Sequence, residues 1–288
     1  MSFCVGGEVD PFHPPVKTFL DFLLWEYRRG RSTGARYSYR TMNVIRSAVS
    51  AVALIDGKPA GQHPLACRFL KAVFNENPAL PRYHTVWDPD VVLSYLKGLG
   101  QNEGLSLIQL SRKLTMLMLL TSGQRGQTIM VLDVRNLSFS GGCASFRIGD
   151  PLKNSRANFH LSQVTFYPFG VDIRLCVVET LSHYLKRTEG IRGVVTSLFI
   201  TSRPPFQVAS RDTIRRWTKD VMRAAGIDLS LFAPASTRAS SSSNAALSVS
   251  LGLILRTGGW SSDSVFGKHY NKPLCNLDGF ASAVLGTS

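Results

Sequence analysis

FAPASTRASSSSNAALSVSLGLILRTGGWSSDSVFGKHY, residues 232–270, is the stretch around which the rest of this chain is organised. It begins with an arginine in a serine-flanked turn, Ser236-Thr237-Arg238, and continues with small residues from Ala239 to Leu255 that predict a buried helix. Gly258-Gly259-Trp260 follow, and Tyr270 comes ten residues after the tryptophan among polar neighbours. A hydrophobic core needs no Arg, Trp and Tyr at the ends of a small-residue helix, so the stretch indicates a functional site.

The length and charge of the chain limit what it can be. A chain of 288 residues is too long to fold around one small hydrophobic core, and its length is typical of two domains. Lys and Arg number 33 against 19 Asp and Glu, so the net charge of +14 indicates a polyanionic partner, nucleic acid first and an anionic membrane surface second. Residues 1–86 carry 11 basic and 6 acidic residues, and residues 87–288 carry 22 and 13. Because both parts are basic, we expect a two-part clamp around a phosphate backbone.

The cysteines number five, and no two form a Cys-x-x-Cys pair. This pattern favours a reducing compartment and argues against a disulfide framework or a zinc site. The chain starts without a basic-then-apolar signal and has no apolar run of about 18 residues, so we expect neither an export signal nor a membrane span. Five histidines lack ligand spacing and are interpreted as structural or surface residues: His13, His63, His84, His160 and His183.

Residues 1–80 predict a helical domain with basic faces. Apolar residues recur at helical spacing in three segments, of which the second covers residues 35–54. Arg36 and Arg40 lie one turn apart and away from the apolar stripe of this segment, where they face either solvent or a DNA backbone. Residues 81–89 contain two prolines and predict an interdomain linker.

Residues 90–288 predict a second domain in which the sequence period changes. An apolar helix over 105–120 ends just before Gln124-Arg125-Gly126-Gln127. Apolar and polar residues then alternate in three segments between residues 136 and 166. This alternation predicts a three-stranded meander with Lys153 in its second turn.

Helical spacing returns over 171–187 and again over 211–225, where Arg215, Arg216 and Lys219 lie mostly on the outward face. Helices thus account for most of the chain, and the strands are few and short. The sequence therefore predicts a mainly α fold with a small antiparallel β-meander.

Three basic residues occupy structural junctions. Arg125 follows the apolar helix, Lys153 lies on a hairpin tip and Arg238 opens the stretch quoted above. Together with Trp260 and Tyr270, this ordered set resembles the tyrosine recombinases, also called the phage-integrase family. The resemblance is closest to the recombinases of DIRS- and Ngaro-type retrotransposons, which are mobile elements. The motifs with this likeness are Thr121-Ser-Gly-Gln-Arg-Gly-Gln-Thr128 and Gly258-Gly259-Trp260-Ser-Ser…Phe266…Tyr270.

The resemblance implies a helical core-binding domain, then an α+β tyrosine-recombinase catalytic domain that cleaves and rejoins DNA. Arg125 and Arg238 would hold the scissile phosphate, since guanidinium groups suit a planar, multi-donor task. Tyr270 would attack it, form a 3′-phosphotyrosyl intermediate and expel a 5′-hydroxyl, with Lys153 as general acid. The Trp260 indole N–H would donate to the phosphate. Because bond energy stays in the protein–DNA linkage, we expect neither ATP nor a metal cofactor.

The resemblance also implies partners: double-stranded DNA, and copies of the chain itself as a dimer on each site and a tetramer in synapsis. We expect no membrane and no metal partner. Residues 271–288 would form a short apolar helix that docks on a neighbouring protomer or on its own domain. Such an integrase acts inside the cell, in the nucleus if the mobile element is eukaryotic and in the cytoplasm otherwise. The residues expected to contact DNA are Arg36, Arg40, Arg156, Arg215, Arg216 and Lys219.

Two positions depart from the family's pattern. The family's His-x-x-Arg motif would place histidine at Ala235, and the acidic residue often found three positions after the first arginine is Thr128. Three interpretations of Ala235 stay open: the site works slowly, another group substitutes for histidine, or the chain is a catalytically impaired DNA-binding protein. A type IB topoisomerase-like enzyme, which uses the same chemistry without strand exchange, is a further alternative.

Overall fold

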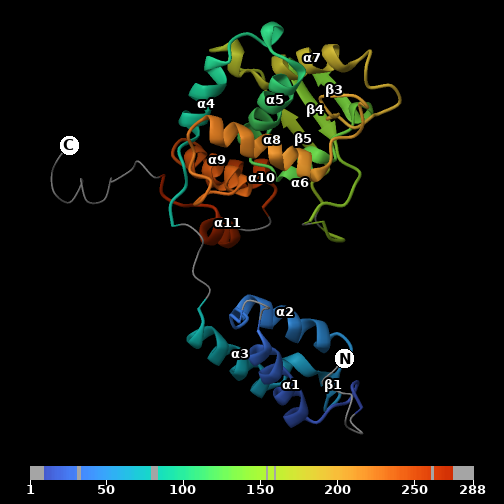
Figure 1. Cartoon of the computed structure of the whole chain (residues 1–288), viewed down its shortest axis with the longest axis vertical. Helices are drawn as coiled ribbons and strands as arrows, with labels where there is room; N and C mark the ends of the chain where they lie inside the picture. The colour runs from blue at the N-terminus through green and yellow to red at the C-terminus, as the bar shows by residue number, and fades with distance from the viewer. Residues whose placement is uncertain are drawn as a thin grey trace, which may run out of the picture. The chain divides into compact units, whose positions relative to one another are not determined.

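The computed structural model describes residues 10–30, 34–78, 84–153, 155–158, 160–260 and 263–274 (Figure 1). The chain divides into two compact units, Met1–Arg82 and Tyr83–Ser288. Each unit has a hydrophobic core of its own, so each is described separately.

Within the described residues of the smaller unit, three helices pack around a common core with a short hairpin beside them. The core includes Phe19, Tyr27 and Met42. The second helix is shorter than the 35–54 expected from the sequence, because the Ser38 hydroxyl accepts a backbone N–H and caps its start. The elements are α1 Val16–Arg29, α2 Tyr39–Ser50, β1 Leu54–Ile55, β2 Lys58–Pro59, the 3₁₀ turn η1 Ala60–Gln62 and α3 Pro64–Glu76.

The larger unit is built around helix α5, Leu107–Ser122 (Figure 1). Its other helices are α4 Pro89–Gly98, α6 Gly126–Met130, α7 Val177–Thr188, α8 Arg211–Ala224, α9 Thr237–Ala245, α10 Leu251–Gly258 and α11 Asp263–His269, with the 3₁₀ turns η2 Asn102–Gly104, η3 Val134–Asn136, η4 Ile173–Leu175 and η5 Pro234–Ser236. A capping box between Ser106 and Gln109 starts α5. Because α5 is apolar on nearly every side, it is covered by α6, α7, α8 and α9.

Three antiparallel strands pair in sequence order: β3 Leu137–Ser140, β4 Cys143–Arg147 and β5 Gln163–Phe166. Alternate residues of this sheet, including Phe146, Val164 and Phe166, are buried against the core. Gly141 and Gly142 both have positive φ and form the two-residue turn between β3 and β4. The prediction of a mainly α fold with a small antiparallel β-meander is confirmed.

The stretch Ala239–Leu255 is not one buried helix, as expected from its small residues, but parts of two helices. Helix α9 ends at Ala245, and α10 starts at Leu251. The Ser250 hydroxyl accepts the Leu253 N–H and caps α10, so the chain begins a new helix instead of continuing the first. Helix α9 is largely buried, whereas α10 exposes its leucines at 251 and 253.

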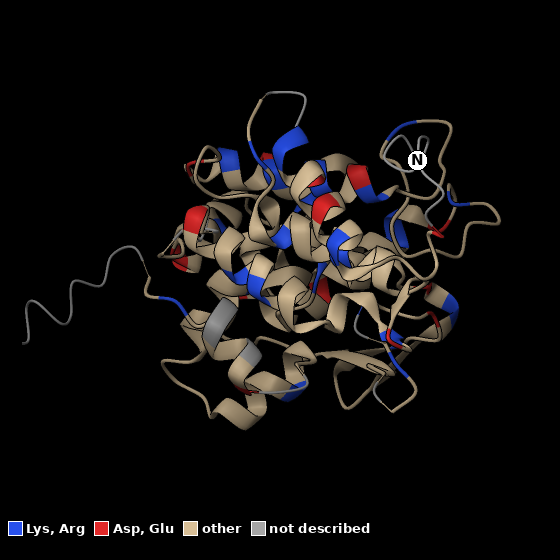
Figure 2. Cartoon of the chain, turned by 90° about the horizontal axis from the view of Figure 1, so that it is seen from below, with Lys and Arg blue, Asp and Glu red and all other residues tan. Residues whose placement is uncertain are grey.

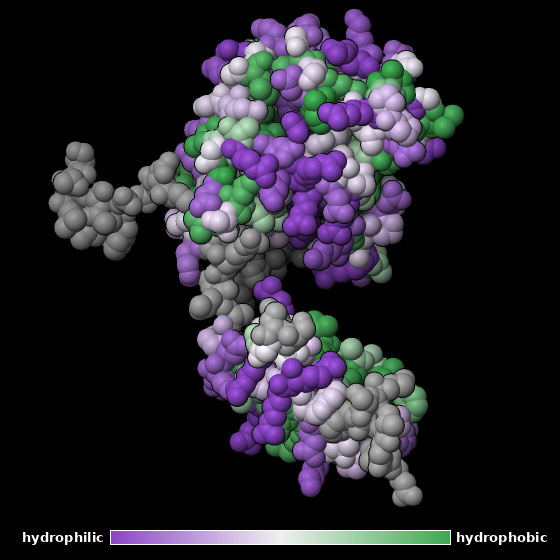
Figure 3. All heavy atoms as spheres, viewed as in Figure 1, coloured by the Kyte–Doolittle hydropathy of each residue, from purple (hydrophilic) through white to green (hydrophobic). Residues whose placement is uncertain are grey.

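Basic and apolar residues are interspersed over the surface. Figure 2 shows Lys and Arg positions on many elements of the chain, not collected in one. The space-filling view shows apolar side chains among hydrophilic ones on the visible face (Figure 3). No helix among the described residues is long and apolar enough to cross a membrane. Most of the segment expected to form a docking helix, 271–288, lies outside the described residues.

We expect Asp133→Asn to destabilise the larger unit in a pH-dependent way. Asp133 Oδ1 accepts the Arg135 backbone N–H, and Oδ2 accepts from Arg135 Nη2 and the Thr196 hydroxyl. Hydrogen bonding from the Arg135 side chain is the main cause that lowers the pKa of Asp133 to about 2. The carboxylate therefore stabilises the fold above its unfolded pKa of about 3.9, and this contribution is lost as the pH falls toward 2.

Urea denaturation measures the effect. At neutral pH the free energy of unfolding of Asp133→Asn should be about 1 kcal/mol below that of the wild type, because the amide can still cap the turn but loses the charge-assisted hydrogen bonds from Arg135. The two values should converge as the pH falls from about 4 to about 2. Asp150→Asn, at an exposed position outside the helices and strands, is the matched control and should unfold like the wild type at every pH tested. A constant difference across this pH range would contradict the role of Asp133.

Candidate active site

Arg238 is the second residue of α9 and is buried, with 3% of its surface exposed. The turn η5 that precedes it is held by a tryptophan from the start of the larger unit. The Trp87 indole N–H donates to the Ser236 hydroxyl at 2.8 Å, and the Ser240 hydroxyl donates to the Trp87 carbonyl at 2.5 Å. Both hydrogen bonds are buried, so the start of α9, and with it Arg238, has a defined position.

Three buried nitrogen atoms at this site have no hydrogen-bond partner within the described part of the chain. They are Nε and Nη1 of Arg238 and Nε1 of Trp260. Arg238 Nη2 donates to the Gly258 carbonyl at 2.8 Å. The guanidinium carbon lies 3.9 Å from the Trp260 ring centroid and 5.2 Å from that of Tyr270. Since buried N–H groups nearly always find an acceptor, these unused donors indicate a place for an anionic ligand.

The electrostatics of Arg238 favour an anion beside its guanidinium group. Burial lowers the pKa of Arg238 to about 10, and the positive charge of Arg125 acts in the same direction. Charge attraction to Tyr270 and hydrogen bonding with its side chain oppose both effects, although neither Nε nor Nη1 makes a hydrogen bond of normal geometry to it. At neutral pH the guanidinium is still charged, and no carboxylate among the described residues contributes to its pKa shift. An incoming anion would remove part of the cost of burying that charge.

Tyr270 directly follows α11 and is half-buried. Its ring lies 5.1 Å from the Trp260 ring at an interplanar angle of 64°. Its backbone is anchored twice: the N–H donates to the Phe266 carbonyl at 2.8 Å, and its carbonyl accepts the Ser243 hydroxyl of α9 at 2.6 Å. The nucleophile expected from the sequence therefore lies against both the tryptophan and the helix that carries Arg238.

Arg125 is half-buried at the start of α6, just after the left-handed residue Gly123 ends α5. The neighbouring Gln124 was not singled out from the sequence, although it is buried. Its Nε2 donates to the Thr257 carbonyl at 2.7 Å, and its Oε1 accepts the Thr128 hydroxyl at 3.3 Å. Gln124 thus ties the turn that carries Arg125 to the end of α10. A polar residue between a buried helix and an arginine is the only sequence signal for it.

Lys153 lies exposed in the connection between β4 and β5, where the sequence placed it. Lys153 and Arg125 line one pocket together with Gly258 and Gly259. Gly258 is also the residue whose carbonyl binds Arg238. The structure therefore gathers the five residues around the Gly-Gly-Trp turn: Arg125, Lys153, Arg238, Trp260 and Tyr270. Ala235, the position of the missing histidine, is exposed in η5.

The residues expected to contact DNA lie on the surface in both units. Arg215, Arg216 and Lys219 are on the exposed side of α8, opposite its buried tryptophan, and α8 packs against α6 and η5. Arg156 is exposed in the same loop as Lys153. In the smaller unit, Arg40 is exposed on α2, and Arg36 forms an ion pair with Glu76.

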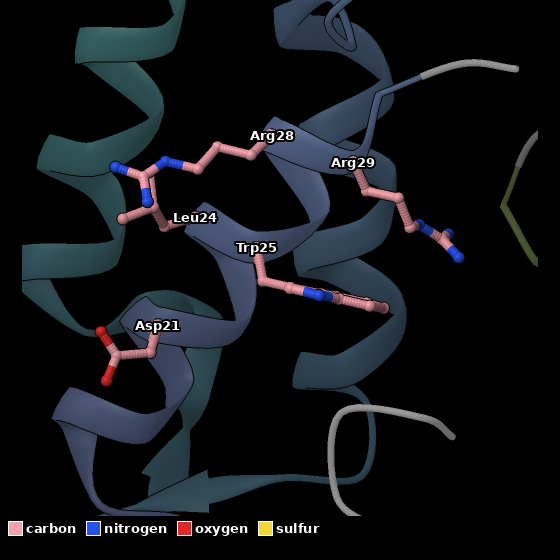
Figure 4. Close-up of a pocket in the computed structure, with 5 residues that line it drawn as sticks. All are labelled: Asp21, Leu24, Trp25, Arg28 and Arg29. Carbon is pink, nitrogen blue, oxygen red and sulfur yellow. The ribbon is translucent and has the colours of Figure 1, made fainter. Parts of the chain in front are cut away.

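A further basic surface lies on α1 of the smaller unit, for which the sequence predicted basic faces but no particular site. Asp21, Leu24, Trp25, Arg28 and Arg29 line a pocket (Figure 4). The Arg29 guanidinium lies 5.0 Å from the Trp25 ring and donates to Glu26 at 2.9 Å. Figure 4 shows Leu24 and Arg28 on one side of α1, and Trp25 with Arg29 on the other.

Comparison with solved structures identifies the fold of this chain. No protein-family model and no curated protein matches the chain. The XerH site-specific recombinase, in a post-cleavage complex with palindromic difH substrate, is 13% identical, with a TM-score of 0.59 over 94% of this chain and 72% of that one. The Tn1549 transposon integrase, in complex with transposon right end DNA, is also 13% identical, with a TM-score of 0.59 over 94% and 85%.

A lambda integrase dimer bound to a COC′ core site is 15% identical, with a TM-score of 0.52 over 91% of this chain and 81% of that one. All three solved structures are site-specific recombinases or integrases. The chain therefore has the tyrosine-recombinase fold.

We expect inorganic sulfate to raise the melting temperature of the protein by occupying the position beside Arg238. A ligand that binds only the folded state stabilises it, and each kcal/mol corresponds to about 2 to 4 °C for a domain of this size. Thermal denaturation in sodium sulfate is compared with sodium chloride at equal ionic strength.

The sulfate-specific shift should be smaller in Arg238→Gln than in the wild type. Arg203→Gln removes the same charge at an exposed loop position and should keep the full shift. Equal shifts in all three proteins would mean that sulfate acts through general salt effects and not at this site.

Proposed function

We propose that this protein is a tyrosine recombinase that cleaves and rejoins duplex DNA through a 3′-phosphotyrosyl intermediate. The observation that carries the proposal is the set of three unpartnered buried donors, on Arg238 and Trp260, next to Tyr270. A phosphodiester supplies the anionic oxygens that these donors lack. The net charge of +14 and the DNA-bound structures of the same fold further support DNA as the substrate.

The reaction assigns one task to each side chain. The Tyr270 oxygen forms a bond to phosphorus, the bond from phosphorus to the 5′-oxygen breaks, and the phenolic proton passes to water. Arg238, Arg125 and the Trp260 indole stabilise the charge that develops on the non-bridging oxygens. Lys153 donates a proton to the departing 5′-oxygen. Rejoining runs the same steps in reverse, so the bond energy is conserved without a cofactor.

More specifically, we infer that the protein is an integrase of a mobile element of the DIRS- or Ngaro-type retrotransposon class. It would act as a dimer on each DNA site and as a tetramer in synapsis. The motifs around Arg125 and Trp260 support the element class. The lambda integrase dimer on its core site supports the assembly by analogy of fold. An enzyme from a eukaryotic element would act in the nucleus.

Ala235 favours a second candidate function, a DNA-binding protein with little or no cleavage activity. Position 235 is exposed and bears a methyl group where the resemblance implies histidine. A methyl group can neither accept the phenolic proton nor donate to a phosphate oxygen. The remaining donors of the site can still hold a phosphate, so the two functions differ in catalysis and not in binding.

A covalent-adduct assay tests the proposal. The full-length protein is incubated with nicked duplexes that are randomised over the binding region, and covalent protein–DNA adducts are separated on a denaturing gel and sequenced. We expect adducts with the wild type and none with Tyr270→Phe, which lacks the attacking oxygen. Tight DNA binding without any adduct would favour the second candidate. Relaxation of a supercoiled plasmid without strand exchange would favour a topoisomerase.

The site should tolerate histidine at position 235. Because Ala235 is exposed, Ala235→His places an imidazole on η5 without removing a buried contact. If the missing histidine limits proton transfer, we expect the adduct to form about 100-fold faster in this variant, the lower end of the range for general acid–base catalysis. Ala235→Gln, a polar side chain that does not titrate, is the matched control and should not accelerate the reaction.

Arg215→Gln and Lys219→Gln should each weaken DNA binding at all sequences. Removing one phosphate contact lowers the slope of log affinity against log salt by about one. Fluorescence anisotropy of a labelled duplex over a range of salt concentrations measures this slope. Lys186→Gln, at an exposed position of α7, removes the same charge and should leave the slope unchanged. An equal effect of all three variants would mean that α8 is not a specific contact surface.

A further inference from the structure

The connection that carries Lys153 is closed at its base. The Ile148 N–H, just after β4, donates to the Ser162 carbonyl, just before β5, at 2.8 Å. His160 lies beside this base, with its Nε2 2.9 Å from the Ile148 carbonyl oxygen. Because a carbonyl oxygen can only accept, Nε2 carries the proton of this hydrogen bond. In the neutral ring, Nδ1 is then an acceptor.

The other ring nitrogen reaches the turn that contains Lys153. His160 Nδ1 lies 2.8 Å from the Ser155 hydroxyl, which donates to it. The same hydroxyl oxygen accepts the Leu152 N–H at 2.8 Å, and the Ser155 N–H donates to the Leu152 carbonyl at 2.8 Å. Two hydrogen bonds therefore join Leu152 to Ser155, and Lys153 directly follows Leu152.

This turn is also held against the rest of the site. Leu152 and Leu161 pack on the core of the larger unit. Leu161 lies at contact distance from Gly259, since a Cβ there would be 3.7 Å from its methyl groups. Lys153 shares its pocket with Arg125. The hydrogen bonds of His160 and the packing of the two leucines thus act on the same turn.

We propose that His160 is a positioning residue for Lys153, acting through the Ser155 hydroxyl. This inference rests on the proposed function. A lysine on an unconstrained turn must give up many conformations before its Nζ reaches one leaving oxygen, and a turn that is already closed lowers this entropic cost. His160 itself need not touch DNA. Its effect is confined to the step in which Lys153 gives its proton to the 5′-oxygen.

That step has a chemical signature. When oxygen is the leaving atom, it needs the Lys153 proton, because it would otherwise depart as an alkoxide. When sulfur replaces the bridging 5′-oxygen, the leaving group is a thiolate. The pKa of a thiol is about 8.5, against about 15.7 for water, so the thiolate departs without a proton. A variant that harms only the placement of Lys153 should therefore recover on the sulfur substrate.

The experiment uses the full-length protein and a duplex recovered from the randomised pool by its adduct with the wild type. The duplex is synthesised with oxygen or with sulfur at the bridging 5′ position. Ser155→Ala and His160→Ala should form the adduct about tenfold or more slowly than the wild type on the oxygen duplex, and within about twofold of it on the sulfur duplex. Lys153→Ala should show the same pattern with a larger defect.

Two matched variants complete the test. Ser155→Thr keeps the hydroxyl group and should match the wild type on both duplexes. Ser162→Ala changes a serine of the same loop whose side chain lies outside the hydrogen bonds described above, and it should also match the wild type. Melting temperature and DNA affinity are measured for every variant, so that misfolding is separated from misplacement of Lys153.

Each outcome has one meaning. Wild-type rates for Ser155→Ala and His160→Ala on the oxygen duplex would overturn the inference and leave the proposed function intact. A defect of equal size on both duplexes would overturn it as well, because the loss would then be structural. If the wild type forms no adduct with any duplex, the proposed function fails and this inference fails with it.

Discussion

The Arg238 guanidinium, buried and stacked 3.9 Å over the Trp260 ring, is the interaction on which the site depends. Burying a cation is expensive, and the aromatic face offsets only about 2 kcal/mol of that cost. The fold adds one hydrogen bond, from Nη2 to the Gly258 carbonyl, and no described residue accepts from the other two nitrogen atoms of this guanidinium. The charge and the donors are thus in position before an anion arrives, which is the condition for electrostatic stabilisation of a transition state.

Small residues make this arrangement possible. A Cβ on Gly258 would overlap the Trp260 ring, so only glycine lets the end of α10 lie against the indole. The serine run at the start of the Ala239–Leu255 stretch lies in α9, and three of its four hydroxyl groups donate to carbonyls outside this helix. Ser240 reaches Trp87, and Ser243 reaches Tyr270. Small polar residues therefore allow close approach and also connect the arginine, the tryptophan and the tyrosine.

The two departures from the family's pattern have different effects. Thr128 leaves the site with more positive charge than the resemblance implies, and Ala235 leaves it without an imidazole base. Thr128 replaces an acidic residue, and it bonds to the neutral Gln124. No carboxylate at position 128 therefore offsets the charges of Arg125 and Arg238, which raises the attraction for a phosphate. Ala235 removes a group that could take the phenolic proton. Under the proposed function, the two departures would therefore act in opposite directions on anion binding and on proton transfer.

The sequence by itself determined the mainly α class, the meander and the junction positions of Arg125, Lys153 and Arg238. It could do so because periodicity, turn residues and breaks in an apolar helix are local properties. The expectation of one helix over Ala239–Leu255 was wrong because a serine cap is a weak local signal beside a long run of small residues. Only the tertiary structure decided that these residues meet around one Gly-Gly-Trp turn. It also revealed what holds them there: Trp87, Gln124 and His160. Hydrogen bonds and packing between residues far apart in the chain decide these positions, and such contacts leave no periodic trace in the sequence.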